Sequence, residues 1–142
     1  MEIVDVLQAS LVPIVILSAA ALLSLLLQQR YGRVIDRIRI FHEKLMKENS
    51  WKNLIMEQLK ILIKRGKMLR NAMFFLMLCI LFAVLSTFFL SIEILGGNAA
   101  SIVLLFFFLS LSSLFISITF AIVEMFISYQ AVLKEDEQIR KI

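Results

Sequence analysis

Apolar residues form three long blocks along the chain, and polar residues collect almost entirely between the first two blocks. The blocks cover residues 6–27, 72–95 and 101–128. Each is long enough for the roughly 20 helical residues that cross the apolar core of a bilayer. The pattern predicts an all-α membrane protein with three transmembrane helices, built as a single domain over residues 1–142.

The polar segment, residues 29–71, has a helical pattern of its own. Apolar residues recur in it at spacings of three and four, in two runs: Val34, Ile38, Phe41 and Leu45, then Ile55, Leu59, Leu62, Gly66 and Leu69. The polar residues 48–50 between the runs are typical of a turn. We therefore expect two amphipathic helices that pack as an antiparallel hairpin. Only Gly32 weakens helix formation near the end of the first block, so we expect one continuous helix from about Val4 to Glu48.

Charge fixes the expected orientation. Twelve of the fifteen Lys and Arg residues lie within residues 29–71, and basic loops stay on the cytoplasmic side of a membrane. We expect a cell-membrane protein with a cytoplasmic hairpin, a cytoplasmic tail over residues 131–142, and an N-terminus outside. The acidic start, Met1–Asp5, is unlike the positively charged start of a secretory signal peptide.

The first block differs from the other two in side-chain size. It is rich in small and polar residues, whereas eleven phenylalanines lie in the second and third blocks. Small residues let membrane helices approach closely, so we interpret the first span as an inner helix. The candidate lining of a pore or helix contact is Gln8, Ser10, Pro13, Ser18, Ala21 and Ser24. Pro13 is expected to bend this span, as a tolerated kink or as a gating hinge.

Acidic residues mark two further positions. Glu2, Asp5 and Glu93 fall on the expected outer side, where they anchor the interface or form an acidic mouth that attracts an inorganic cation. Glu124 lies on the third span and shares a helical face with Ser110, Ser113, Ser117 and Ser128. A membrane carboxylate is costly unless it is paired, so we predict an ion pair with Arg70, or with Lys67 as the second choice. A structural pair and an ion-handling role both remain open.

Catalytic and cofactor patterns are missing from the sequence. It has no Gly-rich phosphate loop and no His/Cys/Asp cluster at metal-ligand spacing, and its one cysteine, Cys79, allows no intrachain disulfide. We expect no enzyme, no cofactor and no metal site. Nucleic acid is not expected as a partner either, since basic residues beside membrane spans are first of all topology signals.

Three segments resemble the family of small prokaryotic membrane proteins known as domain of unknown function 2721. They are Leu11-Val12-Pro13, the run over residues 28–39 that contains Arg30-Tyr31-Gly32-Arg33-Val34-Ile35-Asp36-Arg37, and the Lys64-Arg65-Gly66-Lys67-Met68-Leu69-Arg70-Asn71-Ala72 segment. The resemblance covers nearly the whole chain and is most specific at residues 30–37. It implies three spans with a cytoplasmic helical segment, and it brings no catalytic residues.

Two functions from different classes fit these features. In the first, which the sequence favours, the protein is a homo-oligomeric, cation-conducting pore built around the first span. In the second, it is a membrane-anchored scaffold or regulator whose basic hairpin binds a protein partner or the anionic lipid of the inner leaflet. The residues expected to make those contacts are Arg30, Arg33, Arg37, Lys60, Lys64 and Lys67.

Overall fold

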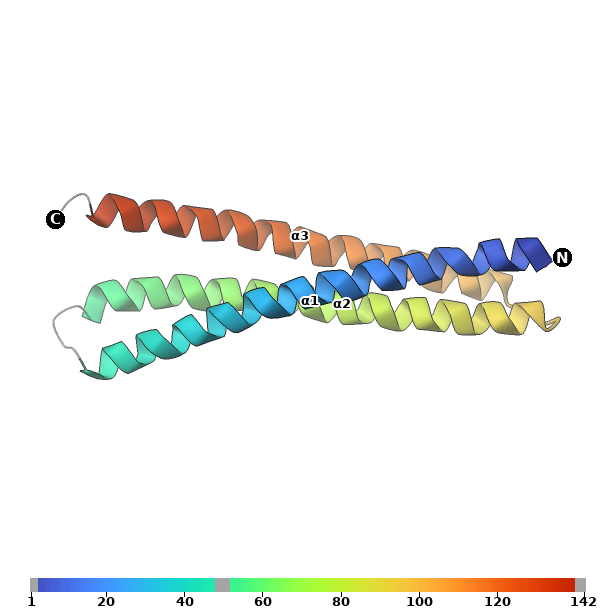
Figure 1. Ribbon diagram of the computed structural model, residues 1–142, viewed down its shortest axis with the longest axis horizontal. Coiled ribbons are helices and arrows are strands. Elements are labelled where there is room, and N and C mark those ends of the chain that lie inside the picture. The colour runs from blue at the N-terminus through green and yellow to red at the C-terminus, as the bar shows by residue number, and fades with distance from the viewer. Residues whose placement is uncertain (1–2, 48–51, 140–142) are drawn as a thin grey trace. The chain divides into compact units, whose positions relative to one another are not determined.

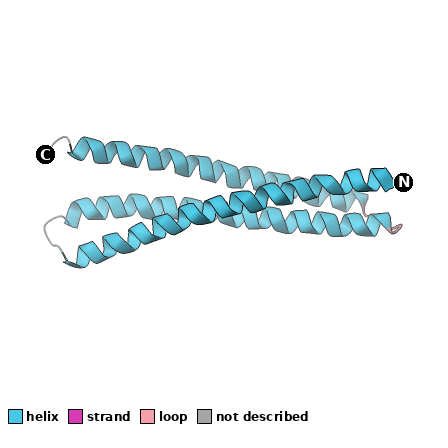
Figure 2. Ribbon diagram, viewed as in Figure 1, coloured by secondary structure: helices cyan, strands magenta, loops and turns pink. Residues whose placement is uncertain are grey.

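The described part of the chain is helical almost throughout. The computed structural model describes residues 3–47 and 52–139. They form α1 (Ile3–Lys47), α2 (Lys52–Ile94) and α3 (Ala100–Ile139), as Figures 1 and 2 show. All three helices are long and apolar enough to cross a membrane, which identifies an integral, multi-pass membrane protein. Each has 40 residues or more, about twice what a crossing needs, so part of each helix extends beyond the hydrocarbon.

Helix α1 confirms the expected continuity between the first span and the polar segment. It runs from Ile3 to Lys47 without a break at Gly32, and it also continues through Pro13. The expected end at Glu48, and the turn at residues 48–50, lie outside the described residues. Helix α3 runs on to Ile139, so most of the segment interpreted as a charged tail continues the third helix.

The chain divides into two compact units, and every helix contributes to both. Unit 1 contains the described residues up to Leu26 together with Met73–Ser117. Unit 2 contains the described residues of Leu27–Ala72 together with those from Ile118 onward.

Small side chains fill the interior of unit 1. Its most deeply buried residues are Ala20, Leu76, Cys79, Ala83, Ser86, Ser110, Ser113 and Ser117. The Ser110 hydroxyl donates to the Cys79 carbonyl at 3.0 Å, and the Ser113 hydroxyl donates to the Phe75 carbonyl at 2.6 Å. From the other helix, the Ser86 hydroxyl donates to the Val103 carbonyl at 3.3 Å. Close packing and interhelical hydrogen bonds hold helices together where lipid gives no hydrophobic drive, so α2 and α3 form the tight pair of unit 1.

A short turn joins α2 to α3 within unit 1 (Figure 1). Gly96 has φ +95°, a left-handed conformation that ends a helix and suits glycine. A Cβ atom on Gly97 would lie 2.8 Å from Ile92 Cγ2 and 2.9 Å from the Ile92 carbonyl oxygen. The Glu93 carboxylate accepts the Ala99 N–H at the start of α3. Gly96, Gly97 and Glu93 therefore each have a structural task in the turn.

The expected division between lipid-facing and inner helices is met only in part. Several phenylalanines of α2 and α3 are exposed, as predicted: Phe74, Phe88, Phe108, Phe115 and Phe126. Others pack inside unit 1, where the Phe89 and Phe106 rings stack with centroids 5.4 Å apart. Helix α1 is not an inner helix within one chain, because Leu22, Leu25 and Leu26 are all more than half exposed. The small residues that fill unit 1 come mainly from α2 and α3.

Unit 2 is built from the apolar stripes of the polar segment. Val34 is buried on α1, and Ile55, Leu59, Leu62, Gly66 and Leu69 are buried on α2, as their spacing predicts. A Cβ atom on Gly66 would lie 3.6 Å from Val34 Cγ1, so α1 and α2 pack closely at this glycine. Helix α3 adds a third side to the unit and brings Glu124 to its interior.

Candidate functional site

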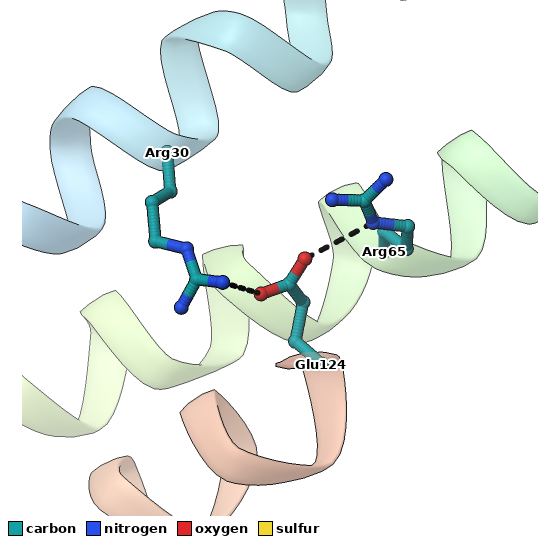
Figure 3. A network of polar contacts seen from close by, with 3 residues as sticks. All are labelled: Arg30, Arg65 and Glu124. Carbon is teal, nitrogen blue, oxygen red and sulfur yellow. Dashed lines mark hydrogen bonds and ion pairs between the residues drawn. The ribbon is translucent and has the colours of Figure 1, made fainter. Parts of the chain in front are cut away.

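In unit 2, one charged side chain from each of the three helices meets at the Glu124 carboxylate. Arg65 Nε donates a hydrogen bond of 3.0 Å to Glu124 Oε1. Arg30 Nη2 lies 3.4 Å from Glu124 Oε2 as an ion pair. Figure 3 shows the carboxylate of α3 between the guanidinium groups of α1 and α2. We call Arg30, Arg65 and Glu124 the arginine clamp.

The positions of the clamp follow from helical spacing. Glu124 lies seven residues after buried Ser117, two helical turns further along the same face of α3. Arg65 precedes Gly66, whose missing side chain lets α1 and α2 pack closely. Arg30 precedes buried Val34 by four residues and so lies near the buried face of α1.

In the arginine clamp, one buried carboxylate is paired with two positively charged guanidinium groups. The Glu124 side chain has 0% of its surface exposed, against 15% for Arg65 and 34% for Arg30. A carboxylate taken out of water needs a charged partner, and here two arginines share that task. Among the described residues Oε2 has no hydrogen-bond partner, so Arg30 contributes by charge and Arg65 by charge and hydrogen bond. The three side chains carry a formal charge of +1 together.

The expected pairing of Glu124 is correct in kind and wrong in partner. The inward face of α3 is confirmed for Ser110, Ser113, Ser117 and Glu124, which are all buried, while Ser128 on the same face is half-buried. Arg70 is exposed, and so is Lys67, while Arg65 takes the hydrogen bond. Arg65 and Arg70 are five residues apart, which places them about 140° apart around a helix with 3.6 residues per turn. The sequence indicates which part of α2 lies beside Glu124, but it does not indicate which basic side chain of that part points towards the carboxylate.

The chain has a recognisable family. A protein-family model described as "Protein of unknown function (DUF2721)" matches residues 10–133, which is most of the chain. The chain belongs to this family. The match includes all three residues of the arginine clamp. No curated protein and no solved structure matches the DUF2721 protein.

Of the residues proposed to line a pore, the four whose side chains the structure describes are not gathered in one place within a single chain. Pro13 is buried, Ser24 is half-buried, and Ser18 and Ala21 are exposed on α1. The Ser18 hydroxyl donates to the Ile14 carbonyl of its own helix at 3.0 Å. Gln8 and Ser10 lie on α1, but the structure does not describe their side chains.

The proposed acidic mouth is likewise not assembled by the described residues of the DUF2721 protein. Glu93 is half-buried and caps the start of α3 through the Ala99 N–H. Glu2, and the surroundings of the Asp5 side chain, are outside what the structure describes.

Unit 2 of the DUF2721 protein has a strongly basic surface. Among the described side chains of residues 27–72, the exposed acids are Asp36, Glu43 and Glu57. The exposed basic residues of the same range are Arg33, Arg37, Arg39, Lys44, Lys60, Lys64, Lys67 and Arg70. Among the described side chains of this range, eight exposed basic residues thus compare with three exposed acidic ones, while Glu124 of α3 is buried and paired with Arg30 and Arg65.

Sequence reasoning missed Arg30 and Arg65 as the partners of Glu124, although a signal for this pairing was present. Arg30 falls between Leu27 and Val34 at spacings of three and four, and all lie near one face of α1. Arg65 falls between Leu62 and Leu69 at the same spacings on α2. A basic residue on an apolar stripe predicts a buried acid opposite it, and Glu124 is the acid that the third span offers.

Proposed function

We propose that the protein is a membrane-anchored scaffold whose basic helical segment binds the anionic phospholipid of the inner leaflet. The carrying observation is the excess of positive charge on the described side chains of residues 27–72, where eight basic side chains are exposed against three acidic ones. The segment acts as the cytoplasmic helical hairpin expected from its sequence, with the N-terminus outside.

The attraction depends on distance from the headgroups. A basic residue near the surface is attracted by about 1 kcal/mol, and the effect falls off within a Debye length of about 8 Å at physiological salt. Along the helix axes, Arg70 lies about 3 Å, Lys67 about 8 Å and Arg33 about 9 Å beyond the apolar blocks. Lys64, Arg37 and Lys60 lie further out, at about 12, 15 and 18 Å. The near set, Arg33, Lys67 and Arg70, therefore supplies most of the attraction.

Two triple variants test this dependence. One replaces the near set by glutamine, and the other replaces Arg37, Lys60 and Lys64, which is the same loss of charge at greater distance. Each protein is reconstituted in phosphatidylcholine bilayers that contain spin-labelled phosphatidylglycerol or spin-labelled phosphatidylcholine. Electron spin resonance then gives the relative association of the two lipids with the protein.

The wild type should prefer phosphatidylglycerol at low salt and lose the preference at high salt. The near-set variant should lose most of it at low salt, by up to about 3 kcal/mol summed over the bound lipids, and the far-set variant should lose little. Equal association of both lipids with the wild type at low salt would refute the lipid-binding scaffold.

A homo-oligomeric, cation-conducting pore is the second candidate. It is supported by the exposure of Ser18 and Ala21 on α1, since small exposed residues allow a second copy of this helix to approach closely. Flux into liposomes tests it with Ala21→Leu, matched by Leu104→Phe at an exposed position of α3. Loss of flux or of assembly in Ala21→Leu alone supports the pore. A monomeric wild type that conducts none of the ions offered excludes it.

A further inference from the structure

The arginine clamp is asymmetric. Arg65 makes the hydrogen bond to Glu124 Oε1 at 3.0 Å and has 15% of its side chain exposed. Arg30 makes the longer contact, 3.4 Å to Oε2, and has 34% of its side chain exposed. Arg65 is therefore the fixed partner of the carboxylate, while Arg30 reaches from the clamp towards the surroundings of the protein.

Charge and donor geometry favour an anion at Arg30. Two guanidinium groups face one carboxylate, so the clamp keeps one positive charge, and its only negative group has no exposed surface. A guanidinium carries five N–H donors in a planar fork that matches the oxygens of a phosphate. Arg30 contacts Glu124 through Nη2, and Figure 3 shows Nη1 directed away from the carboxylate.

The position of Arg30 along α1 points to the source of the phosphate. Arg30 follows Leu27, the last residue of the apolar block, by three residues, or about 4.5 Å of helix. Tyr31 follows directly, and tyrosine is enriched at the headgroup level of membranes. The phosphate groups found at this depth are those of phospholipids.

We propose that Arg30 binds the headgroup phosphate of one anionic phospholipid, with the Arg65–Glu124 pair as the positioning element behind it. The inference rests on the proposed association with anionic lipid, and it adds a single stoichiometric site to the diffuse attraction of the basic surface. Glu124 holds the Arg30 side chain from its buried side, so that its remaining donors face the lipid. A phosphate bridged by two N–H groups of one fork is bound more tightly than one attracted by a mobile lysine.

Native mass spectrometry of the detergent-solubilised full chain tests the site. Phosphatidylglycerol is titrated into delipidated protein, and the dissociation constant of the first retained lipid is measured. Arg30→Gln should weaken it about tenfold, which corresponds to 1.4 kcal/mol. Arg30→Lys should lie between, because lysine keeps the charge and lacks the fork. Arg39→Gln is the matched control, an exposed arginine of the same helix nine residues further on, and should retain the lipid like the wild type.

Two further measurements separate the alternatives. Because Arg65 still pairs with Glu124 in Arg30→Gln, this variant should keep the circular dichroism spectrum of the wild type, which shows that lost binding is not lost folding. Inorganic phosphate at millimolar concentration should not displace the lipid; displacement would overturn the phospholipid assignment in favour of a soluble phosphate.

Retention of the lipid by Arg30→Gln at wild-type affinity would overturn the site. If the wild type still prefers phosphatidylglycerol in bilayers in that case, the scaffold function stands and only the single site fails. If the wild type neither retains phosphatidylglycerol nor prefers it in bilayers, both fail.

Discussion

Replacing Arg65 by glutamine should destabilise the protein much more than the same replacement at Arg30. Arg65→Gln removes the hydrogen-bonded partner of a carboxylate that has no exposed surface, and breaking a buried pair costs about 3 to 5 kcal/mol. Arg30 remains 3.4 Å from the other oxygen and offsets part of the loss, so we expect about 3 kcal/mol. Arg30→Gln leaves the hydrogen bond intact and removes a pair that is one-third exposed on the arginine side, for about 1 kcal/mol.

A double-mutant cycle isolates the interaction from the side effects of each substitution. Arg65→Gln, Glu124→Gln and the double variant are unfolded reversibly in mixed detergent micelles, and far-ultraviolet circular dichroism gives the free energy of unfolding. The double variant should lose less than the sum of the single variants, with a coupling of about 2 kcal/mol. Arg70→Gln is the control, because this exposed arginine should contribute within about 0.5 kcal/mol.

Two results would refute this reasoning. Strict additivity in the cycle would show that Arg65 and Glu124 do not stabilise one another. A larger loss for Arg70→Gln than for Arg65→Gln would show that the clamp is assembled from the wrong side of α2.

Three further predictions concern other parts of the chain. Gly97→Ala should destabilise the folded protein by about 1 to 3 kcal/mol, because the new Cβ would lie 2.9 Å from the Ile92 carbonyl oxygen. Gly32→Ala should stabilise it by up to about 1 kcal/mol, because no atom lies within 4 Å of the position of the new Cβ. The free energy of unfolding in detergent gives the sign of both effects. With Cys79 replaced, a cysteine at Ser50 should be labelled only in permeabilised cells, and labelling of intact cells would reverse the expected topology. If the protein conducts, Asp5→Asn should lower cation flux at low salt and change it little at high salt, because screening shortens the reach of a charged mouth; an equal effect at both salts would exclude a role for this charge.

The helices and their buried faces could be predicted because their signals are local. The first apolar block, residues 6–27, and the apolar run that begins at Val34 belong to one uninterrupted helical pattern. Helix α1 continues from Ile3 to Lys47 as this pattern predicts. The serines of α3 and Glu124 recur at helical spacing, and a polar face inside lipid has a strong physical reason to turn inward. Length and composition were sufficient for three membrane-spanning helices.

The partner of Glu124 could not be predicted with the same security, because it depends on how three helices are rotated about their axes. Arg65 and Arg70 are five residues apart on α2, about 7.5 Å along its axis, and position along the helix does not by itself decide which of the two long side chains reaches Glu124. The rotation of α2 is set by the buried stripe that includes Gly66, which places Arg65 near the interior and Arg70 outside. The inner position expected for α1 rested on side-chain size, but the small residues of α2 and α3 form the interior of unit 1.

The hydroxyl groups between α2 and α3 also bear on how the protein is made. Ser110 and Ser113 donate to carbonyls of α2, and Ser86 donates back to a carbonyl of α3, so the two helices fix each other's register through backbone atoms. A short turn joins the same two helices. The contacts that fix α2 against α3 therefore lie between helices that are neighbours in sequence, so this pair can form early during insertion into the membrane as a helical hairpin.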